Sequence, residues 1–83
     1  MNKSTHTKEY NLLLQLLYSL RLNAGFTQLE LAKRMNVPQS YISKIENGER
    51  RIDIIELRSI CHALNCDMVD FVKELQNRIN ESK

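Results

Sequence analysis

The stretch FTQLELAKRMNVPQSYISKIENG, residues 26–48, decides the fold. Thr27 and Glu30 have the spacing of a capping box, so a helix is expected to begin there. Pro38 is favoured in the first turn of a helix, so a second helix is expected to begin beside it. Two short helices joined by a turn of about three residues cannot pack as an ordinary hairpin. They are expected to cross at a steep angle, with the second projecting from the surface.

The rest of the chain carries the signals of three further helices. Gly25 suits the left-handed position that ends a helix, and Asp53 and Glu56 repeat the capping-box spacing. No run shows the period-two alternation of a strand, so the fold class is predicted to be all-α. The five helices are expected over about residues 7–23, 28–35, 39–47, 53–64 and 67–80. The side chains expected to face the core are Tyr10, Leu13, Leu14, Leu17, Leu20, Leu29, Ala32, Met35, Tyr41, Ile42, Ile45, Leu57, Ile60, Cys61, Leu64, Met68, Phe71, Val72, Leu75 and Ile79.

The length and composition indicate one domain. The chain has 83 residues, of which 42% are hydrophobic and 27% charged, and this is enough apolar material for one compact core. Residues 1–6 are polar and are expected to form a flexible tail, with a single domain over residues 7–83. At this length, no second domain for sensing a ligand is expected.

The charges are distributed unevenly along the chain. Residues 1–52 contain eight Lys or Arg and four Asp or Glu, whereas residues 53–83 contain four and six. A basic first part and an acidic second part is the asymmetry expected if one face of the protein meets phosphate. A chance distribution is the alternative, since the formal net charge of the whole chain is only +2.

Several classes of protein are not indicated by this sequence. No apolar run has the roughly 20 residues needed to span a bilayer, and the N-terminal residues do not resemble a signal peptide. We therefore expect a cytoplasmic protein with reduced thiols. Cys61 and Cys66 have only His62 nearby as a further ligand, so no metal site or cofactor is expected. No arrangement of nucleophile, base and orienting group points to an enzyme.

The quoted stretch and its flanks resemble the Xre/Cro–CI (lambda-repressor-like) helix-turn-helix family of small bacterial and phage regulators. The resemblance runs from about Leu14 to Leu75 and includes Arg21 before the glycine turn and Thr-Gln opening the second helix. It also includes Ile-Glu-Asn-Gly at the end of the third helix and Leu-Arg-Ser-Ile-Cys-His-Ala-Leu in the fourth. It implies a five-helix domain whose third helix enters the major groove of DNA, which is about 12 Å wide.

The resemblance assigns base contacts to the third helix. Gln39 matches a glutamine that pairs with adenine, and its amide offers the donor and the acceptor that adenine N7 and N6 require. Ser40 and Lys44 match further groove-facing positions, and Tyr41 is a fourth candidate for a base contact. The alternatives remain that Gln39 and Ser40 only cap the helix, that Lys44 is a solvated surface residue, and that Tyr41 belongs to the core.

The same resemblance assigns contacts to the DNA backbone and one ion pair. Gln28 matches a glutamine that binds phosphate and supports the third helix, and Arg21 and Glu46 match an ion pair between the first and third helices. Arg50 and Arg51, which the resemblance places against the DNA backbone, could equally be part of a solvated loop. The residues expected to contact the DNA backbone are Thr27, Gln28, Ser43, Arg50 and Arg51.

The resemblance implies a transcriptional regulator that binds double-stranded DNA as a homodimer on a palindromic operator. Such a regulator is expected to act as a repressor or an activator according to the position of the operator. Phe71, Leu75 and Ile79 are the predicted dimer interface, with the first helix (Leu12, Leu16 and Tyr18) as the other candidate surface. The alternative function is an antitoxin, which binds a protein partner as well as its own promoter.

Overall fold

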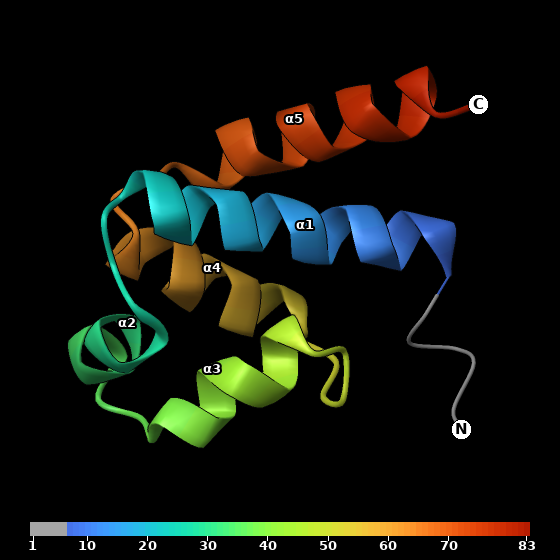
Figure 1. Ribbon diagram of the computed structural model, residues 1–83. Coiled ribbons are helices and arrows are strands. Elements are labelled where there is room, and N and C mark those ends of the chain that lie inside the picture. Colours follow the sequence, from blue (N-terminus) through green and yellow to red (C-terminus); the bar gives the residue numbers. More distant parts are fainter. Residues whose placement is uncertain (1–6) are drawn as a thin grey trace.

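The computed structural model describes residues 7–83, and the predicted tail at residues 1–6 lies outside the described residues. The described part contains α-helices and no strand, so the predicted all-α fold class is confirmed. Each predicted helix is present, with ends within about one residue of the expectation. The helices shown in Figure 1 are α1 (Lys8–Asn23), α2 (Gln28–Met35), α3 (Gln39–Glu46), α4 (Ile54–Ala63) and α5 (Met68–Glu81).

Both predicted capping boxes are formed. The Thr27 hydroxyl accepts a hydrogen bond from the Glu30 amide at 3.1 Å, and the Glu30 carboxylate accepts one from the Thr27 amide at 2.8 Å. Asp53 and Glu56 form the same reciprocal pair at 2.7 and 2.9 Å. Each box satisfies two amides that the first turn of a helix leaves unpaired. These local bonds explain why the sequence alone located the starts of α2 and α4.

The turn between α2 and α3 depends on Asn36, which adopts a left-handed conformation with φ 59°. The Val37 amide donates to the Ala32 carbonyl at 3.0 Å, and this bond closes the end of α2. Asparagine is one of the few residues other than glycine that tolerates this backbone region. Pro38 is the N-cap of α3, one residue before the helical position expected for it.

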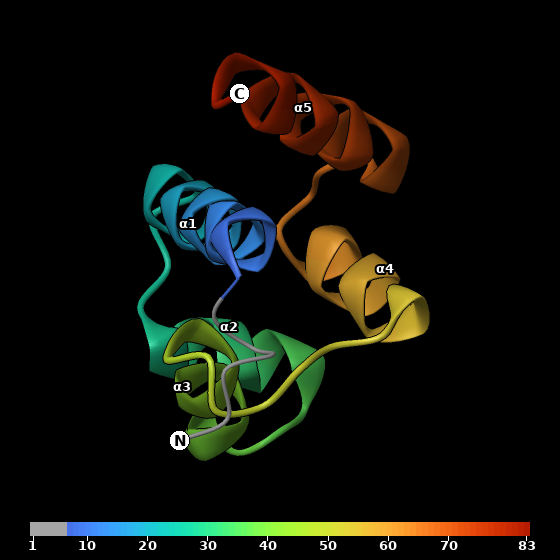
Figure 2. The ribbon, with the colours of Figure 1, turned by 90° about the vertical axis from the view of Figure 1, so that its right-hand side faces the viewer.

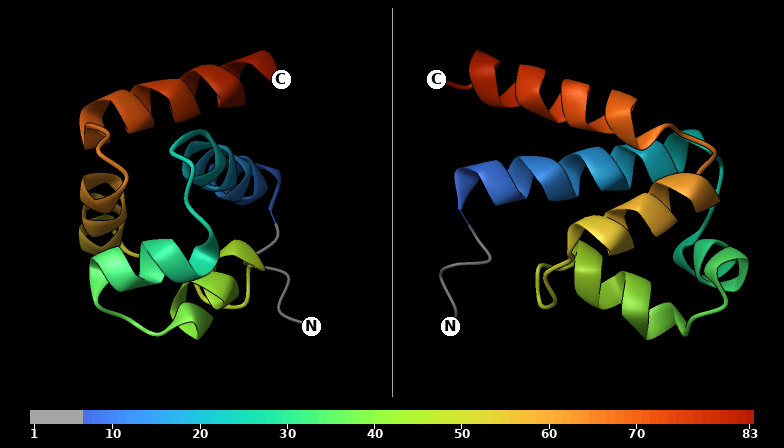
Figure 3. Two further views of the ribbon diagram at one scale, coloured as in Figure 1. Left: turned by 60° about the vertical axis from the view of Figure 1, so that its left-hand side comes forward. Right: turned by 180° about the vertical axis from the view of Figure 1, so that it is seen from behind.

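The helices form three layers, as the views in Figures 1, 2 and 3 agree. α1 and α4 make the middle layer, α5 covers one side of it, and α2 and α3 lie on the other side. α2 and α3 cross steeply, as the short turn between them predicted. The arrangement places α3 at the surface on the side of the molecule opposite α5.

One apolar core joins all five helices. Its most enclosed members include Leu16, Ala32, Ile42 and Ile45, at 2%, 0%, 2% and 2% exposed. Burying each large aliphatic side chain stabilises the fold by about 1.5–3 kcal/mol. The buried apolar residues are Tyr10, Leu14, Leu16, Leu17, Leu31, Ala32, Ile42, Ile45, Leu57, Ile60, Cys61, Ala63, Leu64 and Phe71.

Two expectations about the core are wrong. Leu29 is 46% exposed, and Leu31 is buried in its place. Residues two apart in a helix lie on nearly opposite sides, so only one of these leucines can face inward. Val72 is 44% exposed because Phe71, its neighbour in sequence, turns the inner side of α5 toward the core. Both errors concern the rotation of a helix about its axis, which is set by tertiary packing.

Candidate nucleic-acid interface

α3 presents polar side chains outward while its other side is anchored in the core. Ile42 and Ile45 are each 2% exposed and fix the rotation of the helix. Gln39, Ser40 and Lys44 are exposed, and they are three of the four residues predicted to read bases. The fourth, Tyr41, and the predicted backbone contact Ser43 are both half-buried at the sides of the helix. The helix is about 12 Å long at 1.5 Å per residue, so it can lie within a major groove.

A chain of hydrogen bonds holds the first residue of α3 in place. The Gln39 amide nitrogen donates to the Gln28 side-chain oxygen at 3.4 Å. The Gln28 amide nitrogen in turn donates to Glu46 Oε1 at 3.0 Å. Both functional groups of Gln28 are therefore used to connect the two ends of α3. This bonding orients the Gln39 amide and leaves its oxygen and one N–H directed to other partners.

The chain ends in a buried ion pair between α1 and α3. Arg21 donates to Glu46 through Nε at 2.7 Å and through Nη2 at 3.0 Å, a two-bonded arrangement of the predicted pair. The side chains of Arg21 and Glu46 are 8% and 9% exposed. Arg21 also donates to the Phe26 carbonyl at 2.8 Å. The hydrogen bond that Arg21 donates to Glu46 raises the pKa of Arg21, so the guanidinium stays charged.

Thr27 is exposed at the start of α2, where its hydroxyl oxygen accepts the capping bond from Glu30. A hydroxyl that accepts a hydrogen bond can still donate its own proton. The start of α2 also carries the positive end of the helix dipole. This chemistry suits a phosphate oxygen, and the contact of Thr27 with the DNA backbone stays a prediction.

The loop after α3 holds Arg50 against the helix. Arg50 Nη2 is paired with Glu56 Oε2 at 2.6 Å, and its guanidinium lies over the Tyr41 ring at 4.7 Å. The Tyr41 hydroxyl donates to the same Glu56 oxygen at 3.3 Å. The hydrogen bond from Arg50 lowers the pKa of Glu56 most, and the hydrogen bond from the Asp53 amide lowers it further. Sequence reasoning missed Glu56 as a partner of Arg50, because its capping-box spacing already gave it a role.

Arg51 fixes the other side of the same loop to α1. Its guanidinium lies over the Tyr10 ring at 4.4 Å. The Tyr10 hydroxyl accepts a hydrogen bond from the Ile52 amide at 3.3 Å. Arg51 is exposed and Arg50 is 40% exposed at its side chain, so both cations also face solvent. Each arginine is held against a tyrosine ring, and the predicted contact of this pair with the DNA backbone stays a prediction.

The predicted dimer residues do not share one exposed surface. Phe71 is 3% exposed and is part of the core of its own chain, so its assignment to a dimer interface is wrong. Leu75 lies four residues later on the same side of α5 and packs against the core, and Ile79 is half-buried. On α1, the other candidate surface, Leu16 is only 2% exposed. The exposed apolar side chains of α4 and α5 are instead Ile54, Ile55, Val69 and Val72.

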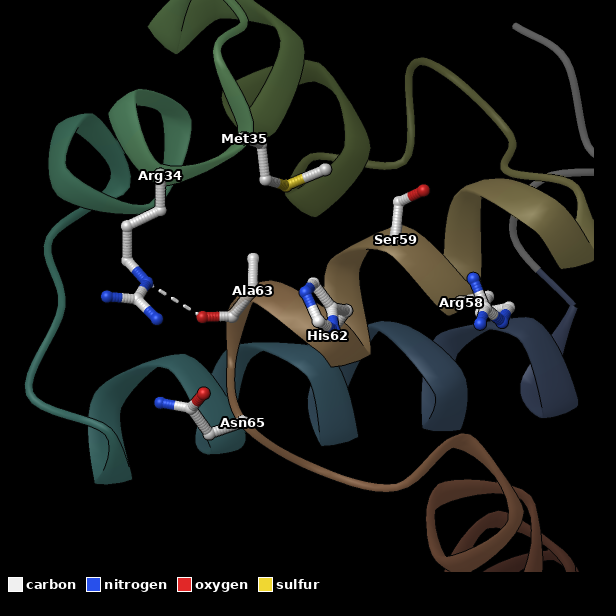
Figure 4. Close-up of a pocket in the computed structure, with 7 residues that line it drawn as sticks. All are labelled: Arg34, Met35, Arg58, Ser59, His62, Ala63 and Asn65. Atoms are coloured by element: carbon white, nitrogen blue, oxygen red, sulfur yellow. Dashed lines mark hydrogen bonds between the residues drawn. The ribbon is translucent and has the colours of Figure 1, made fainter.

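A hollow of about 420 Å³ lies between α2 and α4, and no residue of α3 lines it (Figure 4). Arg34 reaches across it to donate to the Ala63 carbonyl at 2.8 Å, and its guanidinium lies over the Phe26 ring at 4.8 Å. These contacts tie the first helix of the pair to α4 and fix its orientation. The lining residues are Arg34, Met35, Arg58, Ser59, His62, Ala63 and Asn65.

Cys61 is buried and has an inert environment. Burial is the main cause that raises the pKa of Cys61 to about 12, and a hydrogen bond with the neighbouring Cys66 thiol is the second. A thiol with so high a pKa is a poor nucleophile and a poor metal ligand. Among residues 7–83, no three His, Cys, Asp or Glu side chains are grouped so that they could hold a metal ion. No helix in this part has the length and apolar composition needed to cross a membrane.

Comparison with known proteins identifies the family. A family model described as helix-turn-helix matches residues 17–71, which includes both helices of the crossed pair and all of α4. The chain belongs to the Xre/Cro–CI helix-turn-helix family. Its members are DNA-binding transcriptional regulators, so this protein is a transcriptional regulator of helix-turn-helix type.

Three relatives illustrate the similarity within the helix-turn-helix family. An XRE-family like protein from Pseudomonas syringae pv. tomato is 42% identical, with TM-score 0.84 over 92% of this chain and 93% of that one. The wild-type restriction–modification controller protein C.Esp1396I is 29% identical, with TM-score 0.82 over 92% and 99%. The uncharacterized HTH-type transcriptional regulator YqaF of Bacillus subtilis is 37% identical over 57 residues, covering 69% of this chain and 75% of that protein.

Proposed function

We propose that this regulator binds a palindromic operator as a homodimer, with α3 of each copy in the major groove. The observation that carries the proposal is the bonded chain from Gln39 through Gln28 to the buried Arg21–Glu46 pair. It holds the exposed end of α3 in a fixed orientation before DNA is present. Ordering a reading side chain in advance avoids an entropic cost on binding. Because the target is DNA, the protein acts in the cytoplasm.

The bases are read by the exposed residues of α3. The Gln39 amide contacts adenine through N6 and N7, since Gln28 uses only one of its donors. Lys44 lies five residues later on the exposed side of the helix and donates to guanine O6 or N7. Ser40 and Tyr41 contact neighbouring base edges. Each well-made bidentate contact discriminates against a wrong base by about 1–3 kcal/mol.

Phosphate contacts surround this reading helix. Thr27 and Gln28 lie at the positive end of the α2 dipole, and Ser43 lies at the side of α3. Arg50 and Arg51 border the helix on the loop side, each supported by a tyrosine ring. Such contacts fix the register of the protein on the duplex and carry no sequence information directly.

The dimer forms through the outer side of α4 and α5. Ile55 and Val69 are 67% and 60% exposed, more than any other large apolar side chain described in residues 7–83. Arg58 lies between them, because it follows Ile55 by three residues on the same side of α4 and lines the same surface hollow as Val69. Val72 continues this side of α5. For the dimer to bind a palindromic operator, its two α3 helices must lie in half-sites about 34 Å apart.

The test begins with a pool of random duplexes from which the protein selects its own operator. The proposal predicts a selected site with two-fold symmetry and half-site centres about one helical turn apart. Light scattering at micromolar concentration should give a dimer, and Ile55→Asp should give a folded monomer with weaker operator binding. A single unpaired site bound by a monomer would exclude the dimeric account. The antitoxin alternative instead predicts that the protein also co-purifies with a small basic protein partner.

A further inference from the structure

The carboxylate of Glu56 joins α3 to the loop that follows it and to the start of α4. Glu56 Oε1 accepts the Asp53 amide at 2.9 Å and completes the cap of α4. Glu56 Oε2 accepts Arg50 Nη2 at 2.6 Å and the Tyr41 hydroxyl at 3.3 Å. The same side chain therefore connects the first turn of α4, the loop after α3, and α3 itself. Its capping role requires only Oε1, so the contacts of Oε2 need a separate explanation.

The Arg50 guanidinium is restrained on several sides. Its central carbon lies over the Tyr41 ring, 4.7 Å from the ring centroid, and Nη1 donates to the Arg51 carbonyl at 3.2 Å. Glu56 and Asp53 both act to raise the pKa of Arg50, so its charge is compensated by two carboxylates. Three of the five N–H groups of an arginine remain after these bonds. The side chain is still 40% exposed, so these groups can reach a ligand at the surface.

We propose that Glu56 is a positioning residue of the DNA-reading surface, which orders Arg50 and Tyr41 against α3 before DNA binds. The proposal rests on the proposed function, because it assigns these residues to the same interface. Glu56 itself repels phosphate, so it lowers non-specific attraction to DNA. The two effects together raise the ratio of specific to non-specific affinity, which is the quantity that matters against a genome of competing sites.

The decisive variant is Glu56→Gln. The glutamine oxygen can still accept the Asp53 amide, so the cap of α4 is retained. The ion pair with Arg50 is lost, and the guanidinium gains rotational freedom. Ordering one long side chain costs enough to reduce operator affinity by about 3- to 10-fold. Non-specific binding should strengthen, and its dependence on salt should steepen by about one released counterion.

Glu74→Gln is the matched control. Glu74 pairs with Arg78 at 2.9 Å on α5, so this variant makes the same charge change in the same kind of ion pair. It should leave the specificity ratio close to that of the wild type. Operator and random-sequence duplexes are titrated in parallel over a range of salt concentrations. Equal ratios in Glu56→Gln and Glu74→Gln would overturn the proposal.

Two further variants separate positioning from a general loss of stability. Arg50→Lys retains the charge but loses the planar stack on Tyr41, so its specificity ratio should also fall about 3- to 10-fold. In an Arg50→Ala background, Glu56→Gln should change the ratio less, because only the loss of phosphate repulsion and of the Tyr41 contact remains. An unchanged ratio in Arg50→Lys, or a full Glu56→Gln effect without Arg50, would refute the role of Glu56. If the wild type itself does not distinguish operator from random duplex, the proposed function fails instead.

Discussion

Replacing Arg21 by methionine should be the most damaging single change outside the apolar core. Arg21→Met removes two hydrogen bonds to Glu46 and one to the Phe26 carbonyl. It leaves the Glu46 carboxylate, 9% exposed, with the Gln28 amide as its remaining donor. Removing one partner of a buried pair costs about 3–5 kcal/mol, because the other charge stays buried without compensation. Domains of this size have about 5–15 kcal/mol of stability in total.

The measurement is urea unfolding followed by far-ultraviolet circular dichroism, with a thermal melt beside it. A loss of about 3 kcal/mol corresponds to a fall in Tm of roughly 12–25 °C for a domain of this length. The double variant with Glu46→Gln removes the unpaired charge as well as its partner. It should therefore be more stable than Arg21→Met alone.

The comparison of these two variants decides the physical cause. If the double variant is less stable than Arg21→Met by the full effect of Glu46→Gln, the two residues act independently. In that case the loss reflects missing packing of the arginine stem, and the reasoning from a buried unpaired charge is refuted.

The remaining predictions concern the caps, the thiols and the dimer surface. Thr27→Ala should destabilise the protein by about 1 kcal/mol in urea unfolding, because it removes one half of a capping box. The hydrogen bond from the Thr27 amide lowers the pKa of Glu30. The stability that this carboxylate contributes is therefore present above its ordinary pKa and lost as the pH falls through the lowered pKa. Over that pH range, the stability of Glu30→Gln should depend less on pH than that of the wild type. A thiol reagent at pH 8 should modify Cys66 in the native protein and Cys61 only after unfolding; equal rates would contradict the inert environment of Cys61. Val72→Asp should shift light scattering toward the monomer while far-ultraviolet circular dichroism still shows a folded helical protein, since this side chain is 44% exposed.

The sequence was most informative where the determinants are local. The reciprocal bonds of Thr27 with Glu30, and of Asp53 with Glu56, span three residues and could be read directly. The turn after α2 was expected, but the left-handed conformation of Asn36 that closes it was not predicted. Helix boundaries were therefore predictable to about one residue.

The errors arose where distant segments decide. Leu29 and Leu31 are equally apolar, and only the packing of α2 shows which of them is buried. The position of Phe71 in the apolar stripe of α5 fits both a dimer surface and the core. Only the packing of α5 against α1 shows that it belongs to the core. The ion pair of Glu56 with Arg50 joins the first turn of α4 to the preceding loop. Helical periodicity does not predict a contact between a helix and an irregular loop.

The most direct test of the account is operator binding by the wild type and by Gln39→Ala, at two salt concentrations. Gln76→Ala, an exposed glutamine on α5, is the matched control. If α3 reads DNA, Gln39→Ala weakens operator binding by about 1–3 kcal/mol and leaves binding to random duplex unchanged. The control variant then binds like the wild type. Equal affinity of Gln39→Ala and the wild type for the operator would contradict the claim that α3 is the reading helix.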